Sequence, residues 1–174
     1  IEQMPEQDWV SLSQSGLTPI QAGRFYVHGS HDKPDNEAPY PILVDAGHAF
    51  GTGHHGTTKD CLQILDTLSE EGFEPETILD LGTGAGILAI GAAKLFPEAQ
   101  ILATDIDPVA VEVAQENAEV NDVSYATLVA DGFQAEGLKD QTFDLVIANV
   151  LAGPLRGLAP EISKALSPNG QANL

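Results

Sequence analysis

Apolar runs of strand length alternate with segments of helical periodicity over most of the chain. Continuous apolar runs predict strands at 77–82, 100–107, 126–131 and 143–150. Apolar residues that recur at helical spacing predict helices at 57–72, 86–96, 108–121 and 154–166, the last with an internal proline. Strands without polar alternation are typical of a parallel sheet that is covered on both faces. We therefore expect a doubly wound α/β domain with a mostly parallel sheet.

The N-terminal part of the chain is more polar and less regular. We expect residues 1–23 to be an irregular linker or extension. Two short strands at 24–29 and 40–47 should follow and form a small N-terminal β extension of the domain. The last four residues, QANL, are typical of the opening of a further strand. The domain is thus expected over 24–174, and we expect the natural chain to continue beyond both ends.

The chain is strongly acidic. Its 26 Asp and Glu residues stand against 7 Lys and Arg, for a formal net charge of −19. This charge repels nucleic-acid phosphates and attracts basic proteins, so we expect no direct nucleic-acid binding. The longest apolar stretch, 86–96, contains Lys94 and is too short to span a bilayer, so no membrane partner is expected. The single cysteine, Cys61, fits a reducing, cytoplasmic location and should be a buried structural thiol.

The first of the four strands at 77–150 runs into a turn that is rich in glycine. The segment reads ILDLGTGAGILAI, and three glycines alternate in it: Gly82, Gly84 and Gly86. Bare backbone at a helix start lets a ligand approach closely and offers unpaired N–H groups. A dinucleotide-binding turn would need glycine or alanine at the position of Ile87. The spacing from Asp80 is instead D-x-G-x-G-x-G, the signature of S-adenosylmethionine-binding methyltransferases, so Asp80 and the three glycines are candidate cofactor residues.

Two polar residues end later strands of the predicted sheet. Asp105 would stand at the carboxyl edge, where a carboxylate can accept both ribose hydroxyls of an adenosyl ligand. Alternatively, Asp105 is an acid at the start of the helix that begins at Pro108. Asn149 ends the fourth strand, where its amide would lie near the methyl group of the cofactor and orient an acceptor amine. The alternative for Asn149 is a cap on the turn that follows.

Four segments together resemble the ribosomal protein L11 methyltransferase family: GHAFGTGHHGTTKDCLQILD, ILDLGTGAGILAI, ATDIDPVAVEVAQENAEVN and IANVLAGPLRGLAP. The resemblance implies a Rossmann-like class I fold. It also implies S-adenosylmethionine-dependent N-methylation of the lysine ε-amines and the N-terminal α-amine of L11, a basic ribosomal protein. It places the cofactor contacts at Thr58, Gly82, Asp105 and Asn149, with Asn149 as the catalytic residue. Phe50 lies in a glycine-rich loop expected at 47–56, which would close over the cofactor.

Two departures from the family pattern bear on the site. Gly56 stands where the family has proline, which should leave the loop less pre-set. The family also carries a separate N-terminal domain that docks the substrate, and this chain looks like the catalytic domain with its linker. Three histidines crowd the loop: His48, His54 and His55. No cysteine or second cluster completes a metal site around them, so none is expected.

Three other functions stay open on the sequence alone. The first is a methyltransferase of the same fold that acts on another protein or on a small molecule. Among these, the glutamine N5 enzymes usually have Asn-Pro-Pro-Tyr where this chain reads Asn-Val-Leu-Ala at 149–152. The second is a cofactor-binding module without catalysis. The third is a nucleotide-dependent oxidoreductase, which Ile87 disfavours.

Overall fold

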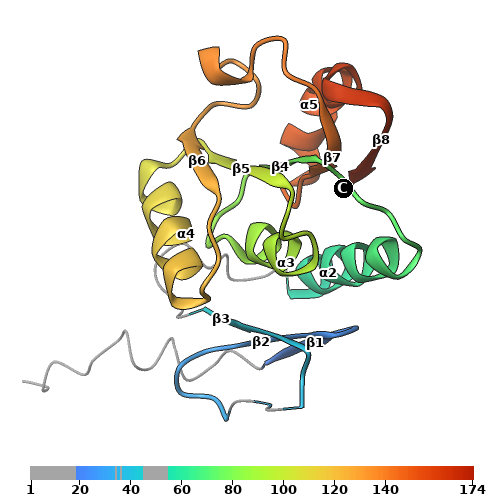
Figure 1. Ribbon diagram of the computed structural model, residues 1–174. Helices are drawn as coiled ribbons and strands as arrows, with labels where there is room; N and C mark the ends of the chain where they lie inside the picture. Colours follow the sequence, from blue (N-terminus) through green and yellow to red (C-terminus); the bar gives the residue numbers. More distant parts are fainter. Residues whose placement is uncertain (1–18, 34, 36, 45–54) are drawn as a thin grey trace, which may run out of the picture.

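The computed structural model describes residues 19–33, 35, 37–44 and 55–174. Within these residues the chain forms two sheets (Figure 1). The larger sheet contains β4 (Thr77–Leu81), β5 (Gln100–Asp105), β6 (Ala126–Val129), β7 (Phe143–Ile147) and β8 (Leu166–Asn173). The smaller sheet contains β1 (Ile20–Ala22), β2 (Phe25–His28) and β3 (Tyr40–Leu43). The helices are α2 (His55–Glu70), α3 (Ile87–Leu95), α4 (Pro108–Val120) and α5 (Ala152–Ala165), with a 3-10 turn η1 (Glu136–Leu138).

The larger sheet has the strand order β6-β5-β4-β7-β8, and every neighbouring pair is parallel. The chain moves outward from β4 through β5 to β6 and then crosses to β7 on the other side of β4. The strand order therefore reverses between β4 and β7. In open α/β sheets, ligands bind at the carboxyl ends of the strands beside such a reversal.

Helices cover both faces of this sheet, as expected for a doubly wound fold. α2, α3 and α4 lie on one face and α5 lies on the other (Figure 1). The strands alternate accordingly, because Ile78 packs into the core beneath α2 and α3 while Leu79 packs into the core beneath α5. Neither side of the central strands is left for water, which explains their continuous apolar sequence.

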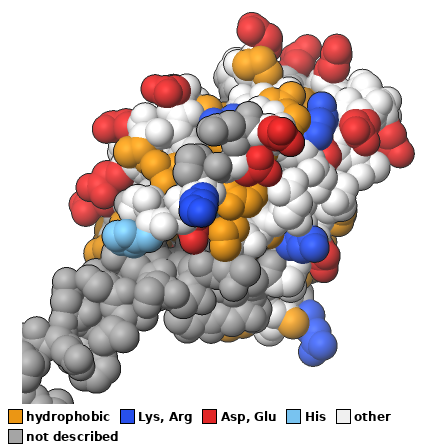
Figure 2. All heavy atoms as spheres, turned by 90° about the horizontal axis from the view of Figure 1, so that it is seen from below, with side chains coloured by type: hydrophobic (Ala, Val, Ile, Leu, Met, Phe, Trp, Pro, Cys, Tyr) orange, Lys and Arg blue, Asp and Glu red, His pale blue; other side chains and the backbone are white. Residues whose placement is uncertain are grey.

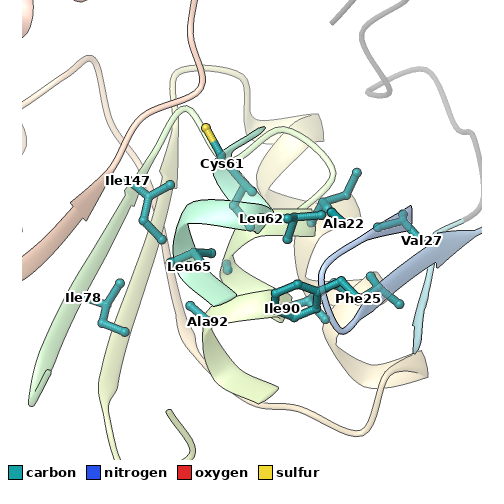
Figure 3. Packing of buried hydrophobic residues seen from close by; sticks show 14 of the residues in the cluster. Ala22, Phe25, Val27, Cys61, Leu62, Leu65, Ile78, Ile90, Ala92 and Ile147 are labelled. Carbon is teal, nitrogen blue, oxygen red and sulfur yellow. The ribbon is translucent and has the colours of Figure 1, made fainter. Parts of the chain in front are cut away.

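The smaller sheet shares the first of these cores. Phe25 of β2 and Ile42 of β3 are fully buried and belong to the cluster that contains Leu62, Leu65 and Ile90. Figure 3 shows Phe25 packed beside Ile90, with Leu62 and Leu65 of α2 between the two sheets. The N-terminal β extension is therefore packed onto the helices of the larger unit and has no separate core of its own among the described residues.

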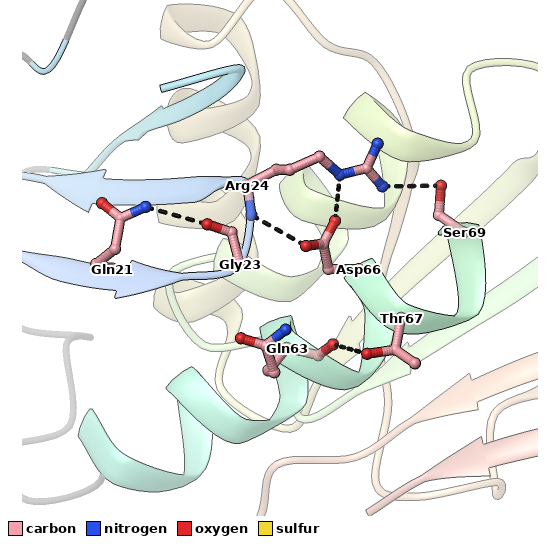
Figure 4. Close-up of polar contacts among 7 residues, drawn as sticks. All are labelled: Gln21, Gly23, Arg24, Gln63, Asp66, Thr67 and Ser69. Carbon is pink, nitrogen blue, oxygen red and sulfur yellow. Dashed lines mark hydrogen bonds and ion pairs between the residues drawn. The ribbon is translucent and has the colours of Figure 1, made fainter. Parts of the chain in front are cut away.

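An ion pair fixes the smaller sheet on α2. The carboxylate of Asp66, which is 2% exposed, accepts hydrogen bonds from the Arg24 backbone N–H at 3.0 Å and from the Arg24 guanidinium (Figure 4). The guanidinium also donates to the Ser69 hydroxyl at 3.2 Å. Gly23, at φ +55°, precedes Arg24, and a Cβ there would collide with Asp66. Only glycine allows the tight turn and the close approach together.

Two stretches differ from the sequence-based expectation. β1 lies inside the region expected to be irregular, so the boundary expected at residue 23 falls within the β1–β2 hairpin. β8 starts at Leu166, directly after α5, although only its last residues were predicted as strand. Its first part is irregular, because the pairing moves from Phe143–Leu166 to Leu145–Gln171. Ser167, Pro168, Asn169 and Gly170 therefore have the sequence of a turn and lie in a bulged strand.

Candidate functional site

A cleft of about 1100 Å³ opens at the carboxyl ends of the parallel strands. Four strand ends and two helices, α2 and α5, contribute to its lining. The strand ends supply Leu81 and Gly82 after β4, Asp105 and Ile106 after β5, Ala130 to Gly132 after β6, and Ala148 to Leu151 after β7. α2 supplies Thr57, Asp60, Cys61 and Ile64. The volume is at the upper end of the usual range for small-molecule sites, so the cleft has room for a nucleoside-sized ligand and more.

The glycine turn after β4 forms one wall of the cleft and its glycines are in the left-handed region. The φ angles are +73°, +54° and +83° at Gly82, Gly84 and Gly86. The backbone N–H groups of Gly82 and Thr83 both donate to the Thr104 carbonyl at 2.8 Å, which holds the turn against β5. A Cβ at Gly82 would collide with the Val150 side chain, so glycine here lets the turns after β4 and β7 meet. Gly82 lines the cleft, and Gly84 and Gly86 lie deeper in the same turn.

Asp80 supports this turn from beneath. It is 1% exposed and does not line the cleft. It lies on the face of β4 that α3 covers. Its carboxylate accepts a hydrogen bond from the Thr83 hydroxyl at 2.6 Å. Burial raises the pKa of Asp80 to about 6, although the hydrogen bonds from Thr83 and from the Ala89 backbone N–H act in the opposite direction. The placement therefore favours a structural role for Asp80 over direct contact with a ligand.

Asp105 lies at the carboxyl end of β5 and lines the cleft beside the turn. Its two carboxylate oxygens accept backbone hydrogen bonds from Gly84 at 2.9 Å and from Asp107 at 3.0 Å. The cap of α4 is Asp107, whose side chain accepts from the Val109 N–H at 2.9 Å, and Asp105 lies two residues before this cap. A carboxylate has about four acceptor positions, so Asp105 keeps lone pairs for two hydroxyl donors in the cleft.

Asn149 lines the cleft after β7 and contacts Thr58 of α2, which is not itself among the lining residues. The Asn149 side-chain N–H donates to the Thr58 hydroxyl at 2.9 Å, across 91 residues of sequence. Because α5 starts at a Leu151 cap that lacks a side-chain hydrogen bond, Asn149 does not cap the following helix. Its remaining N–H and its carbonyl oxygen are the polar groups that it can offer to a ligand. The pair thus brings together two of the residues that the sequence analysis selected.

The first turns of α2 line the cleft beside this pair. Cys61 is 4% exposed, and burial raises the pKa of its thiol to about 11, so it is a buried thiol as expected. Gly56 is the second residue of α2, and a side chain there would meet open space. Gly56, which stands where the family has proline, therefore lies in the first turn of α2. The sequence had predicted that the loop would extend to residue 56.

Sequence reasoning missed part of the lining beyond β5 and β6. Ile106 is exposed on the cleft side of the β5 end, and Leu158 reaches the cleft from α5. Asp131 follows β6 in the same way that Asp105 ends β5. The segment ATLVAD ends on an acid as ATDID does. This signal could have selected Asp131 as a third polar residue at the carboxyl edge.

The cleft is acidic, as is the molecule. Among the described residues that line it, the charged ones are Asp60, Asp105 and Asp131. Figure 2 shows acidic side chains spread over the face seen from below, with Lys and Arg side chains scattered between them and not gathered in a patch. A field of this sign attracts cationic groups into the cleft.

Some predictions fall outside the described residues. Phe50, His48 and His54 belong to the segment 45–54, so the loop predicted to close over the cofactor is not placed. In the part of the chain that is described, no cluster of three His, Cys, Asp or Glu residues could hold a metal ion. The described helices include none with the length and apolar character needed to cross a membrane.

Comparison with known proteins gives a consistent result. The family described as Ribosomal protein L11 methyltransferase (PrmA) matches residues 1–174. A protein named ribosomal protein L11 methyltransferase from Brucella abortus is 50% identical over 173 residues, which covers 97% of this chain and 60% of the relative. A protein of the same name from Allorhizobium ampelinum is 47% identical, with 99% and 60% covered. The chain thus spans about 60% of the length of these curated relatives.

A solved structure agrees with the sequence comparisons. The crystal structure of a ribosomal protein L11 methylase from Lactobacillus delbrueckii subsp. bulgaricus has a TM-score of 0.73 and 33% identity, and covers 90% of this chain and 78% of that one. More distant methyltransferases share the fold, such as coclaurine N-methyltransferase, with a TM-score of 0.52 and 20% identity. With the glycine turn, Asp105 and Asn149 converging on one cleft, these matches show that the chain belongs to the ribosomal protein L11 methyltransferase family.

Proposed function

We propose that this chain carries out the methyl-transfer step of an enzyme that N-methylates ribosomal protein L11. The acceptors are lysine ε-amines and the N-terminal α-amine, and the methyl donor is S-adenosyl-L-methionine. Membership in the family and the names of the relatives support the substrate. The observation that carries the proposal is the cleft, which Gly82 of the D-x-G-x-G-x-G turn lines together with Asp105 and Asn149.

The polar and apolar residues that line the cleft suit an adenosyl group. Asp105 presents free acceptor positions for the two ribose hydroxyls, beside the backbone of the glycine turn. Ile106 offers an exposed apolar surface for one face of the adenine ring, and the Asp131 carboxylate offers an acceptor for its amino group. Gly82 leaves backbone without a side chain where the remainder of the cofactor passes toward Asn149. Asp80 and the two deeper glycines hold this surface in shape.

S-adenosylmethionine supplies a methyl group on a positively charged sulfur, so the protein mainly has to position the acceptor. When bound, the cofactor would supply this methyl group to the amine nitrogen, which would then release a proton to water. Asn149 is an amide without useful basicity, so it acts by accepting an amine N–H and aiming the lone pair. Thr58 holds the Asn149 side chain through their 2.9 Å hydrogen bond.

The acidity of the cleft sets a condition on the acceptor. A lysine with a pKa of about 10.4 is almost fully protonated at neutral pH, and an α-amine with a pKa of about 7.7–8.0 is protonated to a lesser extent. Negative charge from Asp60, Asp105 and Asp131 attracts the ammonium form and favours it. Binding at the cleft therefore recruits the cation, which gives its proton to water as burial beside Asn149 lowers the pKa of the amine.

The test is a replacement of Asn149 in the full-length protein. Asn149→Ala should keep the cofactor dissociation constant, measured by calorimetric titration, within an order of magnitude of the unaltered protein. It should lose most of the turnover in an assay with labelled donor and purified L11, because the acceptor amine is no longer oriented. Asn169→Ala, which removes an exposed amide on β8, is the matched control and should retain activity.

Two outcomes contradict the proposal. Full turnover by the Asn149→Ala protein would remove Asn149 from the reaction. Binding of the cofactor without methylation of L11 would favour the alternatives, which are another methyl acceptor or a binding module without catalysis. Labelling of fractionated cell extracts would then show whether another protein or a small molecule accepts the methyl group. Mass spectrometry of the labelled product would identify the modified amines.

Three further expectations accompany this function and remain predictions. We propose that the methyl-transfer domain begins at β1 and that the residues before it connect it to a separate part that docks the substrate. The relatives, of which this chain spans about 60%, have room for such a part. We also propose a cytoplasmic location, which the single cysteine fits, and no direct contact with nucleic acid, which the net charge of −19 supports.

A further inference from the structure

Two buried asparagines at the C-terminal end of α4 have no part in the proposed chemistry. Asn117 lies in the last turn of the helix, Asn121 is its C-terminal cap, and each is 7% exposed. Neither lines the cleft. Because a buried amide is costly unless its polar atoms are hydrogen-bonded, the partners of these two side chains show what they hold in place.

Asn117 holds the glycine turn. Its side-chain N–H donates to the Ala85 carbonyl at 2.9 Å, and Ala85 stands between two of the three turn glycines. α4 also packs closely on the turn at Gly86, where an added Cβ would lie 3.1 Å from the Ala114 backbone and side chain. The turn is therefore fixed by α4 as well as by Thr104 and Asp105 of β5.

Asn121 holds the last residue of β3. Its carbonyl oxygen accepts from the Leu43 N–H at 2.9 Å, and its side-chain N–H donates to the Leu43 carbonyl at 2.7 Å. The amide thus pairs with both backbone groups of Leu43, as a neighbouring strand would. The same side-chain nitrogen donates to the Asn117 carbonyl at 2.7 Å, which links the two asparagines.

We propose that Asn117 and Asn121 are positioning residues that tie the cofactor turn to the smaller sheet. The connection runs from Leu43 through Asn121 and Asn117 to Ala85 without touching the cleft. Glycine loses more conformational freedom on folding than any other residue, so a turn with three glycines is costly to hold in one shape. A turn that is already held in shape loses less of this freedom when a ligand binds, which raises affinity. The affinity for S-adenosylmethionine therefore depends on both asparagines, and this inference rests on the proposed cofactor.

The experiment compares four full-length proteins: the unaltered chain, Asn117→Ala, Asn121→Ala and the double variant. Calorimetric titration with S-adenosylmethionine, well below the unfolding temperature, gives each dissociation constant. Each single change should weaken binding by roughly tenfold, the ratio that corresponds to one lost hydrogen bond. The double variant should weaken it by less than the product of the two, because both changes break the same connection. Gln115→Ala, on the exposed face of α4, is the matched control.

Steady-state kinetics supply a second measurement. The KM for S-adenosylmethionine should rise in both single variants, while kcat at saturating cofactor stays near that of the unaltered protein. A merely structural role would lower the unfolding temperature and leave the dissociation constant unchanged. Should an alanine variant fail to fold, Asn117→Ser and Asn121→Ser, which keep a smaller hydroxyl donor, replace it in the same titration.

The outcomes separate the two proposals. If the unaltered protein does not bind S-adenosylmethionine, the proposed function fails. If it binds and the variants bind equally well, the function stands and the positioning role is overturned. The same holds if the double variant raises the dissociation constant by the full product of the two single factors. Weaker binding in both single variants, with a double-variant factor smaller than the product of the two, supports the connection.

Discussion

At the scale of single residues, Asp80 combines a carboxylate with complete burial. Loss of hydration raises its pKa to about 6, and Thr83 and the Ala89 N–H compensate only in part. The charge of nearby Asp105 also raises the pKa. In the unfolded chain the pKa of an aspartate is about 3.9. The folded protein therefore binds a proton at Asp80 at pH values where the unfolded chain has already released it.

This difference makes a prediction for the pH dependence of stability. The stability that protonation of Asp80 contributes is fully present below pH of about 4 and is lost as the pH rises through about 6. The loss should amount to about 3 kcal/mol, as the shift in pKa implies. Asp80→Asn keeps an acceptor for Thr83 and removes the ionisation. Denaturant unfolding between pH 4 and pH 7 should show that the variant gains stability relative to the unaltered protein as the pH rises; parallel curves would contradict the assignment.

Individual site residues could be predicted where a local pattern carries the signal. Asp105 and Asn149 were found because each ends an apolar run, and both line the cleft. Their hydrogen bonds could not be predicted, since Asn149 meets Thr58 across 91 residues. The pattern D-x-G-x-G-x-G does not distinguish residues that face a ligand from residues that support the turn. The sequence therefore predicted both Asp80 and Gly82 as cofactor residues, although of these two only Gly82 lines the cleft.

At the scale of elements, the first turn of α2 carries Thr57 and Thr58 and contains a glycine, Gly56, as its second residue. Gly56 is helical and exposed, and an added Cβ would meet nothing within 4 Å. Glycine in a helix is less favourable than alanine because the unfolded chain has more freedom to lose. The sequence at this end of α2 thus weakens the element that presents Thr58 to Asn149.

Replacing Gly56 by alanine should therefore stabilise the protein. We expect a gain of about 0.4–1 kcal/mol, which corresponds to about 1–4 °C in the melting temperature for a chain of this size. Scanning calorimetry would measure the change. Gly86→Ala is the contrasting variant, because φ is +83° and the added carbon would press on Ala114, so it should be destabilising. A loss of stability in Gly56→Ala would contradict the helical assignment.

The elements themselves could largely be predicted from the chain. Strands β4 to β7 and the four helices follow from apolar periodicity, with ends that differ by a few residues. β1 was missed because three residues are too few to show a pattern, although Ile20 and Ala22 alternate with an exposed Gln21. The start of β8 was missed because Ser-Pro-Asn-Gly is typical of a turn. Pairing with β7 overrides that local preference.

At the scale of the whole molecule, the smaller sheet is joined to the larger unit by apolar packing, by the hydrogen bonds between Leu43 and Asn121 and by a partly buried ion pair. The Asp66 side chain is 3% exposed and the Arg24 side chain 32%. Arg24 also lies over the Tyr40 ring, with 5.2 Å from the guanidinium carbon to the ring centroid. Removal of the arginine leaves a carboxylate in an apolar environment, which is more costly than the loss of a surface contact.

Arg24→Ala should therefore destabilise the protein by about 2 kcal/mol, a value that allows for the partial exposure of the guanidinium. Lys139→Ala removes the exposed pair with Glu136 and is the matched control, with an expected change of less than about 1 kcal/mol. Chemical denaturation of both variants would measure the difference. Equal effects would show that the Arg24–Asp66 contact does not fix the smaller sheet.

The shared core also has a consequence for the order in which the protein is made. The ribosome releases Phe25 and Ile42 early, but the side chains that bury them belong to α2 and α3. Leu43 meets its partner Asn121 only after another 78 residues have been added. Until α2 and α3 have been made, the first strands have nothing to pack on, and they remain open to chaperones and to pairing with other chains. A nascent chain stopped before α2 should therefore be cut rapidly by protease at its N-terminal strands.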